Sequence, residues 1–467
     1  MTPRDTSLDD TGLHQLPPLE EPVPAAAPQG SQLSATETVT TRDQPGGISH
    51  AWRALRAPNF RLFFSGQSVS LIGTWMTRIA TSWLVYRLTG SAWLLGIVSF
   101  MGQIPTFLLA PFAGVWVDRL NKRKVLVWTQ ALAAVQSLAL AALTLTHRIT
   151  ITDILALSAF QGLINAFDMP GRQAFMVEMV DDKRDLGNAI ALNSSIVNLA
   201  RLIGPSLAGM VIALYGEGWC FLVDGISYFA VIASLLAMKL RPLRVPPRQD
   251  TLFQQLQEGW QYVSGFLPIR NLLLLFAIIS LMGMPYTVLM PVFASEVLHG
   301  GPHTLGFLMA AAGVGALAGA VLLALRKSVK GLLRMVPLSA ALFGGGLIAF
   351  GLSHVLWLSL TLMLVVGFGM MQGMAASNTI IQTLAPADKR GRVMSYYTMA
   401  FVGMAPFGSL LAGGLAHAIS ASWTVVITGA CCILGAAWFW RQMKDIRDAI
   451  RPIYRELGII RPAPETN

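Results

Sequence analysis

The sequence predicts an all-α membrane protein of twelve transmembrane helices, arranged as two six-helix bundles with both termini in the cytoplasm. Of its 467 residues, 54% are hydrophobic and 12% are charged, whereas a soluble domain carries about 25% charged residues. Twelve apolar segments of roughly 20 residues or more, the length that spans a bilayer, can be drawn after residue 60. A peptide that occurs twice indicates that these segments form two related halves.

The repeated peptide is a basic turn followed by a Gly-rich apolar segment. Its first copy reads Asp182-Lys183-Arg184 and then Ser206-Leu207-Ala208-Gly209, and its second reads Asp388-Lys389-Arg390 and then Leu410-Leu411-Ala412-Gly413. Both copies occupy the same place in their halves. Two matching halves of membrane-length segments are typical of secondary transporters, which alternate around a central site.

The apolar segments set approximate limits for the twelve helices. In the first half these limits are 62–88, 93–116, 124–146, 151–173, 188–215 and 219–239, and in the second half they are 271–295, 303–326, 331–353, 355–380, 393–418 and 421–441. The two bundles therefore occupy residues 51–239 and 271–441. Residues 1–50 contain no apolar run and no signal-peptide core, which predicts a disordered cytoplasmic tail.

Two further segments are predicted to lie on the cytoplasmic side. Residues 240–270 join the bundles as a linker, in which one helical face suggests a helix lying in the membrane interface. That face consists of Leu252, Leu256, Trp260 and Val263. Residues 442–467 form an amphipathic tail whose basic side chains would face anionic headgroups, or a plain solvated helix.

The orientation follows from the distribution of basic residues. Lysines and arginines gather in alternate turns, at 119–124, 183–184, 239–248, 326–334 and 389–392, and the opposite turns hold essentially Arg148 alone. The positive-inside rule places the basic turns, and with them both termini, in the cytoplasm. Because the net charge of +10 resides in these turns and not on one soluble face, nucleic acid is not an expected partner. The three cysteines lie in apolar segments and predict neither a disulfide framework nor a metal site.

The turn between the second and third segments reads Gly114-Val115-Trp116-Val117-Asp118-Arg119-Leu120-Asn121-Lys122-Arg123. It resembles the G-x-L-x-D-R-x-G-R-K motif of the major facilitator superfamily, with Trp116 at the usual Leu and Asn121 at the usual Gly. Because Asn tolerates left-handed geometry, the turn is expected to survive. The resemblance implies a cytoplasmic gate of Gly114, Asp118, Arg119 and Arg123. Arg119 and Arg123 would reach Glu178, Asp181 or Asp182, and the alternative is a stop-transfer basic turn.

The fifth segment contains Ala200-Arg201-Leu202-Ile203-Gly204-Pro205-Ser206-Leu207-Ala208-Gly209. It resembles the G-x-x-x-G-P-x-x-G-G motif of antiporters in the same superfamily, carried here by Gly204, Pro205 and Gly209, with a generic small-residue packing face as the alternative. Further stretches, such as Gly73-Thr74-Trp75-Met76 and Asn165-Ala166-Phe167-Asp168-Met169-Pro170, are similar to the exporter branch that contains enterobactin exporters and macrolide efflux proteins. The resemblance covers residues 55–440.

Four charged residues fall inside the first-half segments, and the second half has no comparable charge in its spans. They are Arg78, Asp168, Arg201 and Asp224. An unpaired charge at the bilayer centre costs roughly 2.5–3.5 kcal/mol, so these residues must be paired, hydrated or functional. Polar residues accompany them at helical spacing, and we expect the polar faces to converge on a hydrated central cavity. These residues include Gln67, Ser70, Thr74, Gln161, Asn165, Ser194 and Asn198.

A carboxylate in a site of low dielectric constant can take up a proton near neutral pH, so Asp224 and Asp168 are the candidates for proton coupling. Arg78 and Arg201 would hold an anionic group of the cargo or tune these carboxylates. The alternatives are that Asp168 only pairs with Arg172, one turn away, and that Asp224 is exposed near the outer surface. In the second half, Met371 and Tyr286 belong to a group of Met and Tyr residues suited to apolar cargo, or they only fill the core.

These observations predict a major facilitator fold in a bacterial inner membrane and a secondary active efflux transporter. It would export a small amphipathic compound, a drug or a siderophore-like metabolite, by alternating access in exchange for protons. We expect a monomer in the lipid bilayer, with no enzymatic activity, cofactor or metal. Two alternatives remain, namely an importer or symporter on the same fold, and a receptor or secretion scaffold that transports nothing.

Overall fold

The computed structural model describes residues 52–180, 185–239, 252–326, 328–386 and 389–459. The predicted tail at 1–50 therefore lies outside the described residues. The helices of the first half are η1 (Arg53–Arg56), α2 (Pro58–Thr89), α3 (Ala92–Arg119), α4 (Lys122–Leu145), α5 (Ile151–Met179), α6 (Leu186–Tyr215) and α7 (Glu217–Ala237).

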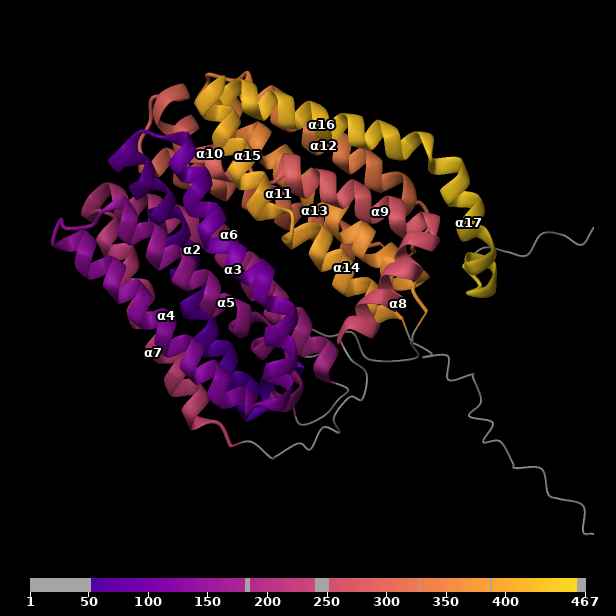
Figure 1. Ribbon diagram of the computed structural model, residues 1–467, viewed down its shortest axis with the longest axis horizontal. Helices are drawn as coiled ribbons and strands as arrows, with labels where there is room; N and C mark the ends of the chain where they lie inside the picture. Colours follow the sequence, from indigo (N-terminus) through magenta and orange to yellow (C-terminus); the bar gives the residue numbers. More distant parts are fainter. Residues whose placement is uncertain (1–51, 181–184, 240–251, 327, 387–388, 460–467) are drawn as a thin grey trace, which may run out of the picture. The chain divides into compact units, whose positions relative to one another are not determined.

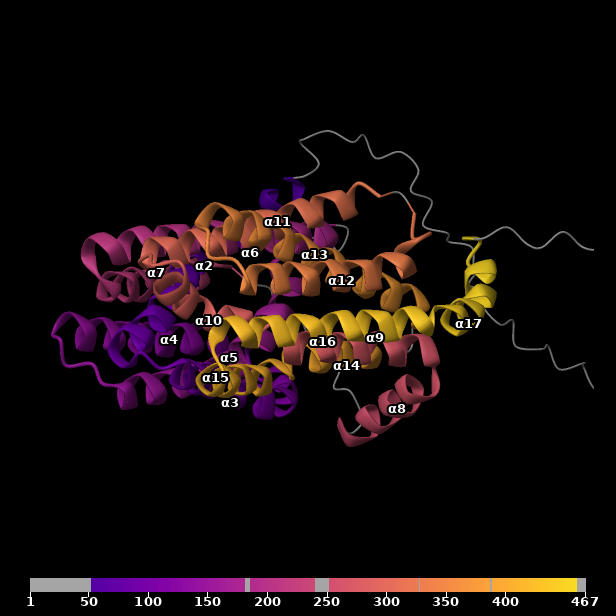
Figure 2. The same ribbon diagram turned by 90° about the horizontal axis from the view of Figure 1, so that it is seen from above.

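The second half continues the helical pattern. Its elements are α8 (Leu252–Gly265), α9 (Leu267–Ile278), η3 (Ile279–Gly283), α10 (Tyr286–Val292), η4 (Phe293–Val297), α11 (Pro302–Ala324), α12 (Leu332–Gly351), α13 (Leu356–Leu384), α14 (Arg390–Val402), α15 (Ala405–Ala418), α16 (Ala421–Arg441) and α17 (Met443–Glu456). Figures 1 and 2 show α2–α7 gathered together and α9–α16 gathered beside them.

Ten segments in the described part of the chain are long and apolar enough to cross a membrane. They include Leu267–Val297, which combines α9, η3, α10 and η4, and Arg390–Ala418, which combines α14 and α15. Helices α2 and α5 are of similar length but are more polar. These two helices carry Arg78 and Asp168, so the polar character that sets them apart belongs to the candidate site.

The segment Leu267–Val297 is longer than the predicted 271–295 and contains two π-helical turns, η3 and η4. Pro285 and Pro291 interrupt the ordinary helical hydrogen bonds, because proline has no N–H to donate. Single π turns absorb such interruptions within a membrane helix. Glu296, one residue beyond the predicted limit of 295, therefore lies within η4.

The linker and the tail both form helices beside the second half. In α8, Val263 is buried but Trp260 is 59% exposed, with its ring 5.9 Å from that of Tyr396. The side chains of Leu252 and Leu256 lie outside the described residues. In α17, Met443, Ile446 and Ile450 are buried, and the helix packs on α9 and α16. The apolar face of the tail therefore covers protein rather than lipid.

The two halves contact one another through the glycines of the repeated peptide. A Cβ atom at Gly209 of α6 would lie 2.8 Å from the backbone oxygen of Pro302 and 3.2 Å from the Cα atom of Gly306 in α11. A Cβ atom at Gly413 of α15 would lie 2.9 Å from the Cα atom of Gly96 in α3. Small residues permit this close approach of helix backbones. The two contacts, Gly209–Gly306 and Gly96–Gly413, are called the glycine contacts below.

Other contacts between the halves accompany the glycine contacts. The Tyr86 hydroxyl donates to the Glu296 carboxylate, and the Ser99 hydroxyl donates to Ser409 Oγ over 3.0 Å. The ring of Phe407 lies against Phe107, with centroids 5.6 Å apart. These residues belong to the parts of α2, α3, η4 and α15 that lie away from the basic turns at 119–124 and 326–334. The halves are therefore joined at the end opposite those basic turns.

We predict that Gly209→Ala and Gly413→Ala each push the halves apart at this joined end, since the new methyl group meets backbone atoms that cannot rotate away. The expected destabilisation of the joined state is about 1–3 kcal/mol. Spin labels are attached at Tyr215 and His299, one in each half. Double electron–electron resonance spectroscopy then reports the change as a longer distance between the two labels.

The matched control is Gly187→Ala in the same helix α6, because a Cβ atom there meets nothing within 4 Å. Distance distributions that are identical in Gly209→Ala, Gly413→Ala and the control would show that the glycine contacts do not hold the halves together.

Candidate transport site

Two arginines and a tryptophan form the centre of the candidate site. The guanidinium carbon of Arg78 lies 4.9 Å from the ring centre of Trp75, and that of Arg201 lies 5.3 Å from the same ring. Trp75 and Arg78 belong to α2, whereas Arg201 comes from α6. The sequence predicted both arginines as site residues but did not predict the tryptophan between them. Spacing of three on one helix, as in Trp75 and Arg78, was a signal that could have found it.

The antiporter-like motif creates the room for this arrangement. A Cβ atom at Gly204 would lie 2.5 Å from Trp75 Cβ, so only glycine allows α6 to approach the tryptophan this closely. At the next residue, the backbone oxygen of Pro205 faces Gly306 of α11. The motif thus packs α6 against α2 on one side and against the second half on the other.

Tyr286 of α10 brings the second half to the site. Its side chain is 4% exposed and its ring contacts Phe343, with centroids 6.2 Å apart. It also interacts electrostatically with Arg201. Of the residues predicted in the second half, Tyr286 is therefore the one that the structure brings to the arginines. Met371 instead lies near Gly319, on the contact between α13 and α11.

Asp224 occupies a separate polar pocket inside the first half. It is 1% exposed, so the alternative of an exposed surface position is wrong. Thr77 donates to its carboxylate over 2.8 Å from α2, and Ser137 donates over 3.1 Å from α4. Thr74 makes a longer contact of 3.5 Å. This carboxylate is surrounded by hydroxyl groups.

Tyr228 was missed by the sequence analysis although it lies four residues after Asp224 on α7. Its hydroxyl is 3.4 Å from Thr74 Oγ1, and it interacts electrostatically with Asp224, Asp168 and Arg78. Residues four apart on a helix are neighbours, and this spacing was the available signal. Tyr228 therefore interacts both with the two carboxylates and with Arg78 of the arginine–tryptophan centre.

Asp168 has a cationic partner. Arg172, one turn along α5, pairs with its carboxylate, and Thr129 and Gln130 of α4 donate to Asp168 Oδ1 over 2.9 and 2.8 Å. This is the arrangement that the alternative reading of Asp168 expected. Asp168 is 5% exposed, and its hydrogen bonds with Thr129 and Gln130 hold α5 against α4.

The remaining predicted polar residues do not all meet in one place. Gln67 is buried with its Oε1 unpaired, Gln161 donates to Asn165 along α5, and Asn198 donates to a backbone oxygen of its own helix. Only the two arginines of the four charged residues come together. Asp168, Asp224 and the two arginines each have different immediate partners, and the convergence of all polar faces on one cavity stays a prediction.

Among the described residues, the gate motif makes one ion pair that was not expected. Lys122 pairs with Glu178 over 2.6 Å, and Arg123 donates to the backbone oxygen of Leu236 in α7. Asn121 has an ordinary φ of −70° and caps α4 by accepting from the Lys124 N–H, so the expected left-handed geometry is wrong. Gly114 has open space around it and Arg119 is exposed. The Asp118 side chain and Asp181–Asp182 lie outside the described residues.

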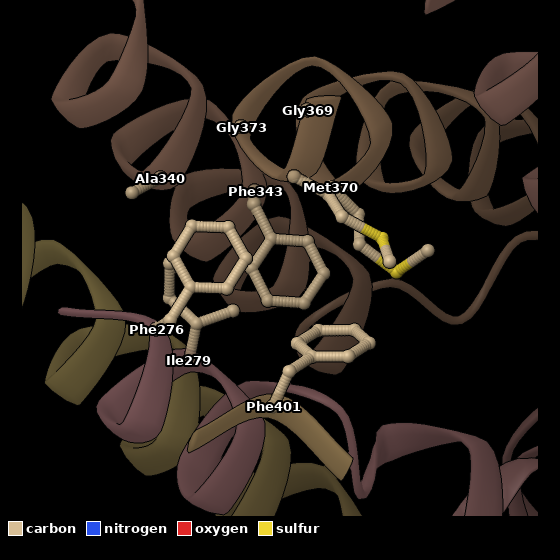
Figure 3. A pocket seen from close by; sticks show the side chains of 9 residues that line it. Phe276, Ile279, Ala340, Phe343, Gly369, Met370, Gly373 and Phe401 are labelled. Atoms are coloured by element: carbon tan, nitrogen blue, oxygen red, sulfur yellow. The ribbon is translucent and has the colours of Figure 1, made fainter. Parts of the chain in front are cut away.

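The second half contains a small apolar cavity of about 10 Å³, roughly the room of a single water. Figure 3 shows the rings of Phe276, Phe343 and Phe401 around it together with Met370. The lining is almost wholly apolar. In this conformation the predicted Met-rich surface packs as core, and its role in contacting cargo stays a prediction.

Comparison with known proteins identifies the family. Residues 49–450 match the family model described as transmembrane secretion effector. The chain belongs to this family of the major facilitator superfamily. It is 27% identical to the staphyloferrin A transporter of Staphylococcus aureus over 75% of this chain and 88% of that protein. It is 25% identical to the multidrug efflux pump Tap of Mycolicibacterium fortuitum over 85% of this chain and 99% of that protein.

A solved structure of the same fold supports this assignment. A bacterial homologue of the human lysosomal transporter Spinster, in an inward-facing and unoccupied conformation, superposes with a TM-score of 0.67 at 14% identity, over 86% of this chain and 99% of that one. The predicted resemblance to major facilitator exporters is confirmed. The protein is a multi-pass inner-membrane transporter of small molecules, not an enzyme.

We predict that Asp168→Asn lowers thermal stability in detergent, because Arg172 loses its counter-charge and Thr129 and Gln130 lose a charged acceptor. Hydrogen bonds to charged groups are worth about 1.5–3 kcal/mol, so a clear fall in apparent melting temperature is expected. The control is Asp448→Asn, which removes an exposed pair with Arg451 at 3.6 Å. An unchanged melting temperature in Asp168→Asn would contradict a structural role for Asp168.

Proposed function

We propose that the protein is a proton-coupled antiporter that exports a small amphipathic compound by alternating access. The observation that carries this proposal is Asp224, a carboxylate that is 1% exposed and is held by hydroxyl groups of Thr77 and Ser137 without a cation among them. Such a group can hold a proton in one state and release it in another. The efflux pump Tap among its relatives supports the direction of transport.

The proposal includes twelve membrane crossings in two bundles, 51–239 and 271–441, with α2 and α5 counted among them. It places the basic turns in the cytoplasm, as the positive-inside rule requires. In that orientation, the glycine contacts and the Tyr86–Glu296 hydrogen bond close the outer end. The conformation described here is then the one that opens toward the cytoplasm, ready to receive cargo from inside.

Tyr228 would couple the protonation of Asp224 to cargo binding at the arginine–tryptophan centre. Tyr228 interacts electrostatically with both Asp224 and Arg78, and Thr74 contacts both the Tyr228 hydroxyl and the Asp224 carboxylate. Protonation of Asp224 removes a negative charge next to Tyr228 and so changes the field at the arginine–tryptophan centre. One proton moving down about 100 mV supplies roughly 2.3 kcal/mol, which corresponds to about a fifty-fold cargo gradient.

We predict that Asp224→Asn, which keeps the shape and hydrogen bonds of the side chain, abolishes proton-driven transport. Everted membrane vesicles loaded with a pH-sensitive dye report proton movement when an amphipathic compound, either the anion 2,6-naphthalenedicarboxylate or the cation ethidium, is added as cargo. The control is Asp153→Asn, which alters a helix cap at Thr150 and is expected to leave exchange intact. Undiminished exchange in Asp224→Asn would overturn the assignment of Asp224, and cargo that moves with the protons would indicate symport.

We predict that a cysteine at His354 reacts with an impermeant maleimide in intact spheroplasts, whereas a cysteine at Lys330 reacts only after permeabilisation. Both positions are exposed and lie at opposite ends of α12. The three native cysteines are replaced by serine beforehand. The reverse labelling pattern would invert the orientation proposed here.

A further inference from the structure

The charges around Trp75 are unbalanced in the described part of the chain. Arg78 and Arg201 flank one tryptophan ring and interact with each other as like charges. Their other electrostatic contacts are with tyrosines, Tyr228 for Arg78 and Tyr286 for Arg201. The Nε atom of Arg201 is buried and has no hydrogen-bond partner. Two guanidinium groups are thus held together without a carboxylate.

The described acidic residues of the surrounding helices form hydrogen bonds or ion pairs with residues other than Arg78 and Arg201. Each described Asp or Glu between residues 58 and 297 has another partner. The pairs are Asp153–Thr150, Asp168–Arg172, Glu178–Lys122, Asp185–Arg53, Glu217–Arg87, Asp224–Thr77, Glu258–Arg392 and Glu296–Tyr86. No described carboxylate is therefore left to neutralise Arg78 and Arg201.

An unpaired charge inside a membrane protein is costly and marks a functional site. Two such charges repel each other as well, so the arrangement favours a ligand that supplies negative charge. Guanidinium groups bind carboxylates through two parallel hydrogen bonds, and the Arg78 side chain is not covered by other side chains in this conformation. The indole face of Trp75 and the ring of Tyr286 provide apolar surface next to the charges.

We infer that the arginine–tryptophan centre is the binding site for an organic anion, in which carboxylate groups pair with Arg78 and Arg201 and an apolar or aromatic body lies against Trp75. This inference rests on the proposed transport function and narrows its cargo to amphipathic compounds with at least one carboxylate. A Cβ atom at Gly313 of α11 would lie 3.5 Å from the backbone oxygen of Arg201, so the bound anion lies next to the second half.

The test is calorimetric binding to the purified full chain in detergent, with 2,6-naphthalenedicarboxylate as the probe and its uncharged dimethyl ester as the matched control ligand. The dicarboxylate is expected to bind, and Arg78→Gln and Arg201→Gln are each expected to weaken binding by about tenfold or more, the value of a lost charged hydrogen bond. Arg61→Gln removes the same charge from an exposed position of α2 and is expected to leave affinity unchanged.

Arg78→Lys and Arg201→Lys keep the positive charge but lose the planar guanidinium group that binds a carboxylate through two hydrogen bonds. If the folded site itself binds the anion, both variants are expected to bind it with an affinity between those of the wild type and the Gln variants. Equal binding of the ester and the dicarboxylate, absence of dicarboxylate binding, or an equal loss in Arg61→Gln would each overturn the inference. Asp224→Asn separates this result from the transport proposal, because it is expected to retain dicarboxylate binding while proton-driven exchange is lost.

Discussion

The close approach of backbones at Gly209–Gly306 and Gly96–Gly413 is the constraint on which the structure depends. Lipid provides no hydrophobic drive for helices to associate, so membrane helices associate largely by close packing of small residues. The repeated peptide supplies one glycine to each contact, from α6 in the first half and from α15 in the second. The two copies of the repeated peptide therefore form two equivalent contacts between the halves.

The same packing positions the candidate site. Helix α6 carries Gly209 against α11 and, slightly earlier, Gly204 against Trp75 of α2. Arg201 lies one turn before Gly204 and so reaches the same tryptophan. A shift of α6 relative to the second half would therefore move Arg201 relative to Arg78. The contact that joins the halves and the contact that builds the site are made by one helix.

The charges of the first half are compensated in three different ways. Asp168 has a cation, Asp224 has hydroxyl groups, and Arg78 and Arg201 have an aromatic ring between them. An isolated charge is expensive in the membrane. Under the proposed function, these differences separate Asp168, which stabilises the fold, from residues that gain a proton or a ligand. Residue type alone did not distinguish Asp168 from Asp224, because both are aspartates on polar helical faces.

The sequence by itself determined the helical segments, the repeated halves and the four intramembrane charges, because length, hydropathy and residue type are local properties. It could not determine that Lys122 rather than Arg123 pairs with Glu178, that Arg201 of α6 reaches Trp75 of α2, or that Thr77 and Ser137 donate to Asp224. Each of these depends on how a helix is rotated, and a step of one residue turns a side chain by about 100° around the axis. Only the packing of neighbouring helices fixes that rotation, so the tertiary structure decided which charges meet.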